Sequence, residues 1–326
     1  MADNRVTRRS TRSHAKISVV GAGHVGATFA YALLLSGMAV EVVLVDKDAA
    51  RARSEALDLS HALPFRVPAN IRAGALDDTV GSDIIVITAG PNQRRGETRL
   101  DLAGRNAVVI REVAATFGAA SPDAIMIVAT NPVDVMARLA QESSGFPAHR
   151  VIGSGTILDT ARLKHLVGRH FGIDPRSLTG HMIGEHGDSA VPLWSMAQVG
   201  GIRLEQLAAA AGVAFDASVR DRLSQEVRNA AYAIIEGKGA TYYAIASGLV
   251  RIVEAIVGDQ RSLLTVSNEV GPDNQALDLG DVWLSMPRIV GRAGILLSPA
   301  LELAADERAA LARSAEVLQA AWNEIQ

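Results

Sequence analysis

Residues 16–35, KISVVGAGHVGATFAYALLL, restrict the fold of this chain more than any other stretch. Residues 16–20 suit a buried parallel strand, and the apolar run that follows Gly26 has the composition of a helix. Between them, Gly21 permits a tight turn, Gly23 lets a pyrophosphate approach the backbone, and Gly26 lets the helix pack closely on the strand. Free amide groups at the start of this helix favour an anion. The stretch therefore predicts a strand–turn–helix unit that binds a dinucleotide.

An acidic residue at the expected distance indicates which dinucleotide is bound. Residues 40–45 form a second apolar run, which ends in Asp46, twenty residues after Gly26. A carboxylate at this place accepts hydrogen bonds from ribose hydroxyl groups and repels a 2′-phosphate. A glycine pattern alone is weak evidence, but the two flanking strands, the helix and the spaced acid make it specific. We therefore expect NAD as the cofactor.

Composition excludes several classes of function. The chain has 326 residues, of which 48% are hydrophobic and 21% charged, and its formal net charge is −3. This balance gives no overall reason to expect nucleic acid or an anionic membrane as a partner. The chain has no cysteine, which excludes disulfides, thiolate nucleophiles and cysteine metal sites, and we expect no metal.

The first residues are interpreted as a tail. Residues 1–15 are basic and almost without apolar side chains, so they lack the apolar segment of a secretory signal, and we expect a flexible basic tail. No apolar run of roughly 18 residues is free of charge, as a membrane span would be. These features predict a cytoplasmic protein.

Strands and helices alternate through the first half of the chain. Further buried strands are expected at residues 84–88, 125–130 and 151–155. This alternation predicts a parallel sheet with right-handed crossovers, whereas after residue 155 long helices and a strand-rich segment follow. We therefore expect an α/β fold. A doubly wound, Rossmann-type NAD-binding domain would span residues 16–155, and a C-terminal α+β substrate and catalytic domain would span residues 156–326, with the two packed tightly.

Residues at the ends of the strands are expected to line one crevice. Ligands of doubly wound sheets bind beyond the carboxyl ends of the strands. The candidate cofactor contacts are Gly21, Gly23, His24, Val25, Gly26, Asp46, Ala89, Gly90, Thr130 and Asn131.

Three polar residues of the second half are candidates for chemistry. Asp159 and Arg162 are three residues apart in a predicted helix, so they share a face whose surroundings are mostly apolar. A surface ion pair is one interpretation, but unpaired charges in such surroundings would be costly. His186 lies between two glycines in GEHGDS. Most histidines are solvated or structural, but one near a dinucleotide crevice suits proton transfer, since its ordinary pKa is about 6.5.

Six motifs in order resemble those of the lactate/malate dehydrogenase family, and of its bacterial lactate-type members in particular. They are GAGHVG, NQRRGETRLDL, ATNPVDV, GTILDTARL, GEHGDS and GKGATYY. The resemblance covers nearly the whole chain, from residue 16 to about residue 319. It implies a reversible, NADH-dependent reduction of pyruvate to (S)-lactate. Family members are usually homotetramers and sometimes dimers, and we expect a homotetramer.

The resemblance also implies a role for each candidate residue. His186 would protonate the carbonyl oxygen of the substrate, and Asp159 would hold the imidazole ring and raise its pKa. Arg162 would bind the substrate carboxylate through two parallel hydrogen bonds, and Arg99 would polarise the carbonyl group. Asn131 would contact the nicotinamide and the substrate.

The loop at residues 92–100 is expected to close over the site and to select the substrate. Family members that reduce oxaloacetate carry an arginine where this chain has Gln93, because that arginine neutralises a second carboxylate. A neutral amide would leave this carboxylate unpaired. Glu97 and Thr241 also match the lactate-type pattern. The two arginines that follow Gln93 are expected to face solvent, although an inward turn of either would admit oxaloacetate.

Two positions depart from the family pattern, and three other functions stay open. Members that fructose 1,6-bisphosphate activates carry an arginine and a histidine where this chain has Lys164 and Thr179. Lysine can attract phosphate but threonine carries no charge, so the sequence does not support this activation. The alternatives are a malate or other 2-hydroxy acid dehydrogenase, an NAD-dependent glycosidase, and a non-catalytic NAD(H) sensor. Such glycosidases typically use a cysteine metal ligand, which is missing here. A sensor would have no need of the four residues His186, Asp159, Arg162 and Arg99 together.

Overall fold

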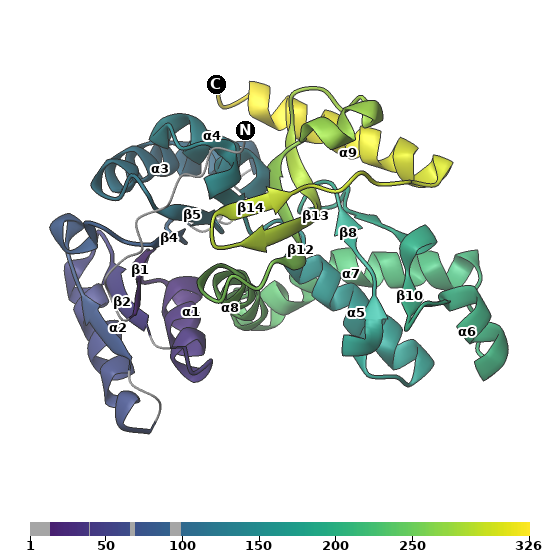
Figure 1. Ribbon diagram of the computed structural model, residues 1–326, viewed down its shortest axis with the longest axis horizontal. Coiled ribbons are helices and arrows are strands. Elements are labelled where there is room, and N and C mark those ends of the chain that lie inside the picture. Colours follow the sequence, from purple (N-terminus) through teal and green to yellow (C-terminus); the bar gives the residue numbers. More distant parts are fainter. Residues whose placement is uncertain (1–13, 39, 66–68, 92–98) are drawn as a thin grey trace, which may run out of the picture.

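Strands from both halves of the chain form one continuous sheet. The structure is a computed structural model that describes residues 14–38, 40–65, 69–91 and 99–326. Within these residues, nine strands are joined in the order β14-β13-β12-β6-β5-β4-β1-β2-β3. Figure 1 shows this sheet crossing the middle of the molecule, with helices on both faces.

The six strands of the first half are parallel to one another. They are β1 (Ala15–Val20), β2 (Val40–Val45), β3 (Asn70–Ala73), β4 (Ile84–Ile87), β5 (Ile125–Val128) and β6 (Val151–Gly153). Their order in the sheet reverses between β1 and β4, which is the arrangement of a doubly wound nucleotide-binding sheet. The predicted fold class is confirmed.

Three antiparallel strands of the second half extend the same sheet. They are β12 (Ser262–Glu269), β13 (Trp283–Gly291) and β14 (Gly294–Leu297). β12 joins the sheet at β6, where Ser267 pairs with Gly153. A Cβ atom on Gly153 would lie 2.8 Å from the Cβ of Ser267, so glycine allows the two strands to approach. The sequence predicted strands in this segment but not their attachment to the first sheet.

Helices cover both faces of the sheet, and some of them build a separate part of the second half. They are α1 (His24–Leu35), α2 (Ala49–His61), α3 (Arg99–Ala120), α4 (Val133–Ser144), α5 (Ile157–Phe171), α6 (Leu204–Ala211), α7 (Ala217–Lys238), α8 (Tyr243–Val257) and α9 (Ala305–Asn323). The separate part contains α5, α6 and α7. Among the described residues, no helix has the length and apolar character needed to cross a membrane.

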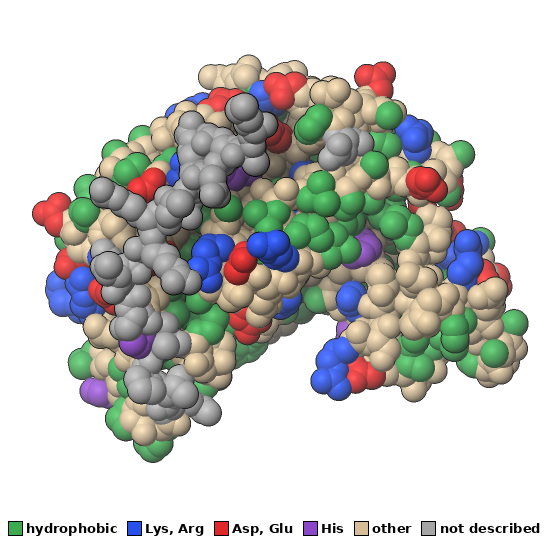
Figure 2. Space-filling model, in the orientation of Figure 1, with side chains coloured by type: hydrophobic (Ala, Val, Ile, Leu, Met, Phe, Trp, Pro, Cys, Tyr) green, Lys and Arg blue, Asp and Glu red, His purple; other side chains and the backbone are tan. Residues whose placement is uncertain are grey.

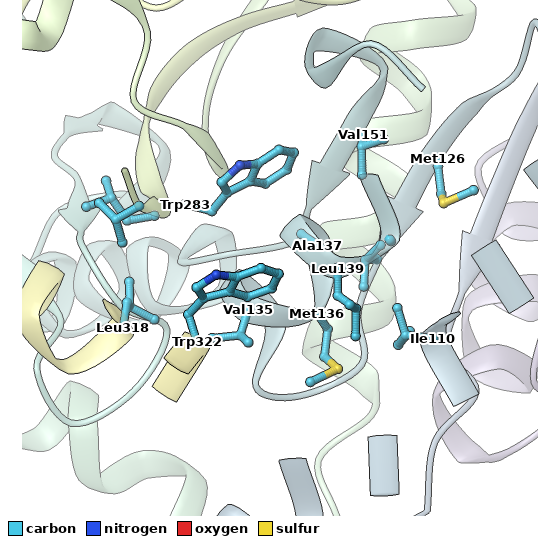
Figure 3. Close-up of a cluster of buried hydrophobic side chains, with 14 of the residues drawn as sticks. Ile110, Met126, Val135, Met136, Ala137, Leu139, Val151, Trp283, Leu318 and Trp322 are labelled. Atoms are coloured by element: carbon cyan, nitrogen blue, oxygen red, sulfur yellow. The ribbon is translucent and has the colours of Figure 1, made fainter. Parts of the chain in front are cut away.

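Each face of the sheet has its own apolar core, because side chains of alternate strand residues point to opposite faces. Ile85 belongs to the core under α3, α4 and α9, and Ile84 belongs to the core under α1, α2 and α8. Figure 3 shows Trp283 of β13 and Trp322 of α9 beside Val135 of α4 in the first of these cores. Helices from both halves share both cores, which agrees with the expected tight packing.

The remaining elements build a third core around α5, α6 and α7. Its small sheet joins β7 (Leu178–Thr179), β10 (Gln198–Val199) and β11 (Ile202–Arg203). In the same region β8 (Met182–Ile183) pairs antiparallel with β9 (Val191–Pro192). The sequence did not predict α6 or β3, which are short.

Two predicted segments fall largely outside the described residues. Of the expected tail at residues 1–15, residues 1–13 lie outside them, and Ala15 already belongs to β1. Of the expected lid at residues 92–100, residues 92–98 lie outside them, and α3 begins at Arg99.

Candidate active site

The glycine loop after β1 has the shape that a dinucleotide requires. Gly21 has φ +109°, a conformation that favours glycine, and a Cβ atom there would lie 2.7 Å from the backbone nitrogen of Ala89. A Cβ atom on Gly26 would overlap the carbonyl oxygen of Gly21. Gly23 differs, because no described atom lies within 4 Å of the place of its missing Cβ. The loop therefore has no room for a side chain at Gly21 or Gly26, where α1 packs on the strand, but it leaves space for a ligand beside Gly23.

The first turn of α1 is available to an anion. Gly23 caps this helix, and no side chain accepts a hydrogen bond from its first-turn amides in the described part of the chain. Free amides and the positive end of the helix dipole favour a pyrophosphate at this place. The residues present therefore fit the pyrophosphate of NAD, which Gly23 would admit and the first turn would bind.

Asp46 lies directly after β2 and faces the glycine loop. One of its oxygens accepts a hydrogen bond from the backbone N–H of Ala22 at 2.7 Å, and the other accepts one from the N–H of Asp48 at 2.9 Å. These bonds fix the carboxylate at the end of the strand. A carboxylate can accept about four hydrogen bonds, so Asp46 keeps the capacity to accept ribose hydroxyl groups.

The ends of β4 and β5 lie together at the same edge of the sheet. The hydroxyl group of Thr130 donates a hydrogen bond to the carbonyl oxygen of Ala89 at 2.7 Å. The buried Asn106 of α3 donates from Nδ2 to the carbonyl oxygen of Asn131, also at 2.7 Å. A Cβ atom on Gly90 would meet both Thr130 and Asn106. Asn106 was not predicted, and it fixes the backbone of the exposed Asn131.

His186, Asp159 and Arg162 form one cluster. Asp159 lies in the first turn of α5, and His186 lies in the turn that follows β8. One carboxylate oxygen of Asp159 is 2.5 Å from Nδ1 of His186, and the other accepts a hydrogen bond from Arg162 at 3.0 Å. The exposed fractions of the side chains are 7% for Asp159, 14% for Arg162 and 22% for His186. The predicted sharing of a helix face by Asp159 and Arg162 is present, and both oxygens of the carboxylate are used.

Electrostatics in this cluster favour a protonated imidazole. Burial lowers the pKa of His186, but the charge of Asp159 and the hydrogen bond to it outweigh burial and raise this pKa to about 9. Burial raises the pKa of Asp159, and the charges of His186 and Arg162 outweigh that effect and lower it. The arrangement therefore holds a proton on a ring whose Nε2 makes no hydrogen bond to the described residues.

A buried carboxylate that was not predicted supports the turn of His186. Asp134, in the first turn of α4, accepts a hydrogen bond from the backbone N–H of His186 at 2.8 Å and one from the hydroxyl group of Ser285 at 3.3 Å. Burial raises the pKa of Asp134 to about 6. Its position as the acidic residue of the apolar run VDVMA was the signal in the sequence.

Thr241 lies where the second half reaches the glycine loop. It is partly buried, in the short connection between α7 and α8. Its neighbour Tyr242 stacks on His24, the first residue of α1, with ring centroids 5.2 Å apart. The predicted substrate residue and the predicted cofactor loop are therefore close in space.

The structure does not describe the side chains of two predicted site residues, and it places two others on α5 and β7. Gln93 lies outside the described residues, and the side chain of Arg99, at the start of α3, is not described. Lys164 is partly buried on α5, where burial lowers its pKa, and Thr179 is exposed on β7.

Comparison with known proteins identifies the family. Residues 15–153 match the model of the lactate/malate dehydrogenase NAD binding domain, and residues 156–326 match that of the lactate/malate dehydrogenase alpha/beta C-terminal domain. The chain belongs to the lactate/malate dehydrogenase family. It is therefore an oxidoreductase whose first half binds NAD, as the glycine loop and Asp46 predicted.

Relatives within the lactate/malate dehydrogenase family match along almost the whole chain. An L-lactate dehydrogenase of Clostridium botulinum (strain Okra) is 46% identical over 312 residues, which are 96% of this chain and 97% of the relative. An L-lactate dehydrogenase of Thermus aquaticus is 47% identical over 310 residues, which are 95% of this chain and 99% of the relative.

Solved structures of lactate dehydrogenases share the fold. MGS-M5, a lactate dehydrogenase from a deep-sea metagenome library, has a TM-score of 0.90 at 37% identity and matches over 96% of this chain and 99% of its own. The minor L-lactate dehydrogenase of Enterococcus mundtii has a TM-score of 0.91 at 34% identity and matches over 97% of this chain and 99% of its own.

Proposed function

We propose that the chain is an NAD-dependent L-lactate dehydrogenase, which reduces pyruvate to (S)-lactate reversibly with NADH. The observation that supports this proposal most is the cluster in which Asp159 bridges His186 and Arg162. A 2-oxo acid presents a carbonyl oxygen that needs a proton and a carboxylate that needs a cation. His186 can supply the proton and Arg162 the cation, and Asp159 binds both side chains. The two relatives compared above are L-lactate dehydrogenases.

His186 is the proposed proton donor and acceptor. Its Nδ1 is bound to Asp159, so the proton for the substrate resides on Nε2. In the direction of lactate, Nε2 gives this proton to the carbonyl oxygen, and in the reverse direction it takes the proton from the hydroxyl group. Asp159 keeps the ring oriented and stabilises the imidazolium form, which the raised pKa of His186 reflects.

Arginines orient the substrate and stabilise developing charge. Arg162 binds the substrate carboxylate with two parallel hydrogen bonds, since the planar guanidinium group matches a carboxylate. Arg99 polarises the carbonyl group as the lid closes. Asn131 and Thr241 complete the proposed substrate pocket from the end of β5 and the start of α8.

The cofactor site uses the glycine loop and the ends of three strands. When bound, NADH supplies the hydride that reduces the carbonyl carbon. The proposed contacts to NAD come from residues that lie at these strand ends, which are Gly21, Gly23, His24, Val25, Gly26, Asp46, Ala89, Gly90, Thr130 and Asn131.

The decisive experiment compares substrates. NADH consumption is measured with pyruvate, oxaloacetate and larger 2-oxo acids, and we expect pyruvate to be preferred over oxaloacetate because Gln93 leaves a second carboxylate unpaired. Gln93→Arg should move kcat/KM towards oxaloacetate. Gln206→Arg, on the exposed side of α6, adds the same charge elsewhere and should leave the ratio unchanged.

Each outcome of this comparison has a clear meaning. Wild-type preference for oxaloacetate would replace the proposal with a malate dehydrogenase on the same scaffold. An unchanged ratio in Gln93→Arg would remove Gln93 as the selector. NADH binding without turnover of any 2-oxo acid would support the sensor instead.

Regulation and assembly are proposed from the resemblance. Lys164 attracts phosphate but Thr179 carries no charge, so we expect fructose 1,6-bisphosphate not to lower the pyruvate concentration for half-saturation. We propose a cytoplasmic homotetramer. Light scattering in solution would give the mass, and a monomer would contradict the proposed assembly.

A further inference from the structure

The two halves of the chain meet at the crevice through stacked rings. The imidazole of His24 and the ring of Tyr242 have centroids 5.2 Å apart and an interplanar angle of 23°. Nζ of Lys238, at the end of α7, lies 3.4 Å from the centroid of Tyr242 and 4.0 Å from that of Tyr243. The two tyrosines contact each other edge to face, with centroids 4.5 Å apart. The ring of Tyr242 is therefore held from several directions.

This stack joins two subsites that the proposed function needs at the same time. His24 is the first residue of α1 and follows Gly23, where the backbone is open to a pyrophosphate. Tyr242 directly follows Thr241, the residue proposed for the substrate pocket. Figure 1 shows α1 and α8 next to each other, and the two helices are in contact. Among these elements, the ring pair lies between the start of one helix and the start of the other.

The exposure of the rings makes their contact adjustable. His24 is exposed and Tyr242 is partly buried, so neither ring is fixed by a surrounding core. A stacked aromatic pair changes an equilibrium constant by roughly three- to tenfold. This size is sufficient to favour one position of the Thr241 segment over another without controlling the fold.

We propose that His24 and Tyr242 are positioning residues that couple NADH binding to substrate binding. NADH beside the first turn of α1 fixes the imidazole of His24, the imidazole holds Tyr242, and Tyr242 holds Thr241 in its substrate-binding position. Coupling of binding equilibria is reciprocal, so the substrate tightens NADH by the same factor. This inference rests on the proposed function, because it requires both ligands to bind in this crevice.

The test measures coupling and not activity. The dissociation constant of NADH is determined by its fluorescence, without and with saturating oxamate, an unreactive isostere of pyruvate, and the ratio of the two constants is the coupling factor. We expect His24→Ala and Tyr242→Ala each to reduce this factor roughly three- to tenfold. The double variant should reduce it no further than the stronger single variant. Taking a ratio cancels any direct loss of NADH affinity.

Matched variants separate positioning from a structural role. His24→Phe and Tyr242→Phe keep a ring at each place and should restore most of the coupling factor. Tyr31→Ala removes a tyrosine that is 45% exposed on α1 outside the stack, and it should leave the factor unchanged. Thermal unfolding of each variant shows that it is folded.

Three results would overturn the inference. They are an unchanged coupling factor in both single variants, a double variant whose loss is the product of the single losses, or a loss of coupling in Tyr31→Ala of the same size. In each case wild-type turnover of pyruvate shows that the proposed function holds. A wild type that neither turns over pyruvate nor binds oxamate would overturn both proposals.

Discussion

The pairing of His186 with Asp159 makes a quantitative prediction for Asp159→Asn. The carboxylate lies 2.5 Å from Nδ1 of His186, and its side chain is only 7% exposed. Its charge therefore acts on the ring with little screening by solvent. Asparagine keeps the volume and a hydrogen-bond acceptor but removes the charge.

The size of the effect follows from the pKa of His186. Burial lowers this pKa, and Asp159 overcomes burial to raise it to about 9. Without that charge, burial is opposed less, and we expect the pKa to fall to ~6.5, its ordinary value, or below. At pH 8 a pKa of about 9 leaves ~90% of the ring protonated and a pKa of ~6.5 leaves ~3%, a difference of roughly 30-fold.

Pyruvate reduction gives the sign of the pH dependence. The reaction needs the protonated ring, so kcat/KM for pyruvate in the wild type should fall as pH rises through about 9. In Asp159→Asn it should fall as pH rises through ~6.5. The raised pKa also stabilises the folded protein fully below pH ~6.5, and this stabilisation is lost as pH rises through about 9.

The assay is kcat/KM for pyruvate and the urea midpoint, each measured between pH 5.5 and 10. Asp174→Asn is the control, because it removes an exposed carboxylate that is paired with Arg176. If Asp159→Asn lost activity by the same factor at every pH, Asp159 would only orient the ring, and the electrostatic reasoning would be refuted.

Other changes test the cofactor loop, the substrate cation and the support of the catalytic turn. Gly26→Ala should unfold at lower urea, since its Cβ would overlap the carbonyl oxygen of Gly21, whereas Gly23→Ala should keep its stability and lose NADH affinity in fluorescence titrations. Equal stability losses would contradict this distinction. Arg162→Lys should raise KM for pyruvate roughly 10- to 100-fold at unchanged NADH affinity, because lysine cannot form the two parallel hydrogen bonds. An unchanged KM would exclude this contact. Asp134→Asn should lower the free energy of unfolding by about 1–3 kcal/mol at pH 7, because it replaces one of two acceptor oxygens with a donor. A urea curve identical to that of the wild type would refute it.

Much of the NAD-binding half was predictable from local patterns. Gly21 has a positive φ and Gly26 has no room for a side chain. Only glycine suits both positions, so the residue types themselves predict the turn. Strands buried on both faces, such as β4 with four buried residues in a row, also give a clear apolar signal.

Elements that depend on distant contacts were harder to predict. β3 has a single buried residue, Ile71, and pairs with β2 through its backbone, so its side chains carry little pattern. The attachment of β12 to β6 rests on Ser267 and Gly153, which are far apart in the sequence and show no periodicity. The start of α7 differs, because it has a local signal: Asp216 accepts a hydrogen bond from the N–H of Val219.

The candidate site likewise contains residues that local sequence patterns predict and residues that they do not. His186, Asp159 and Arg162 are marked by glycines, by spacing and by the family motifs, and the structure brings them together. Asp134 and Asn106 act through backbone groups of other segments, the N–H of His186 and the carbonyl oxygen of a residue that follows β5. A sequence does not show such partners, because any residue type supplies a backbone group.

The joining of β6 to β12 also affects how the chain can fold during synthesis. β6 ends at residue 153 and β12 begins at residue 262, so ribosomes make about a hundred residues before β6 gains its second neighbour. At ordinary translation rates this takes roughly ten seconds. During that time the nascent NAD-binding half presents an unpaired strand edge, to which the edge of another nascent chain can add. We therefore expect chaperones that shield such edges to raise the yield of this protein.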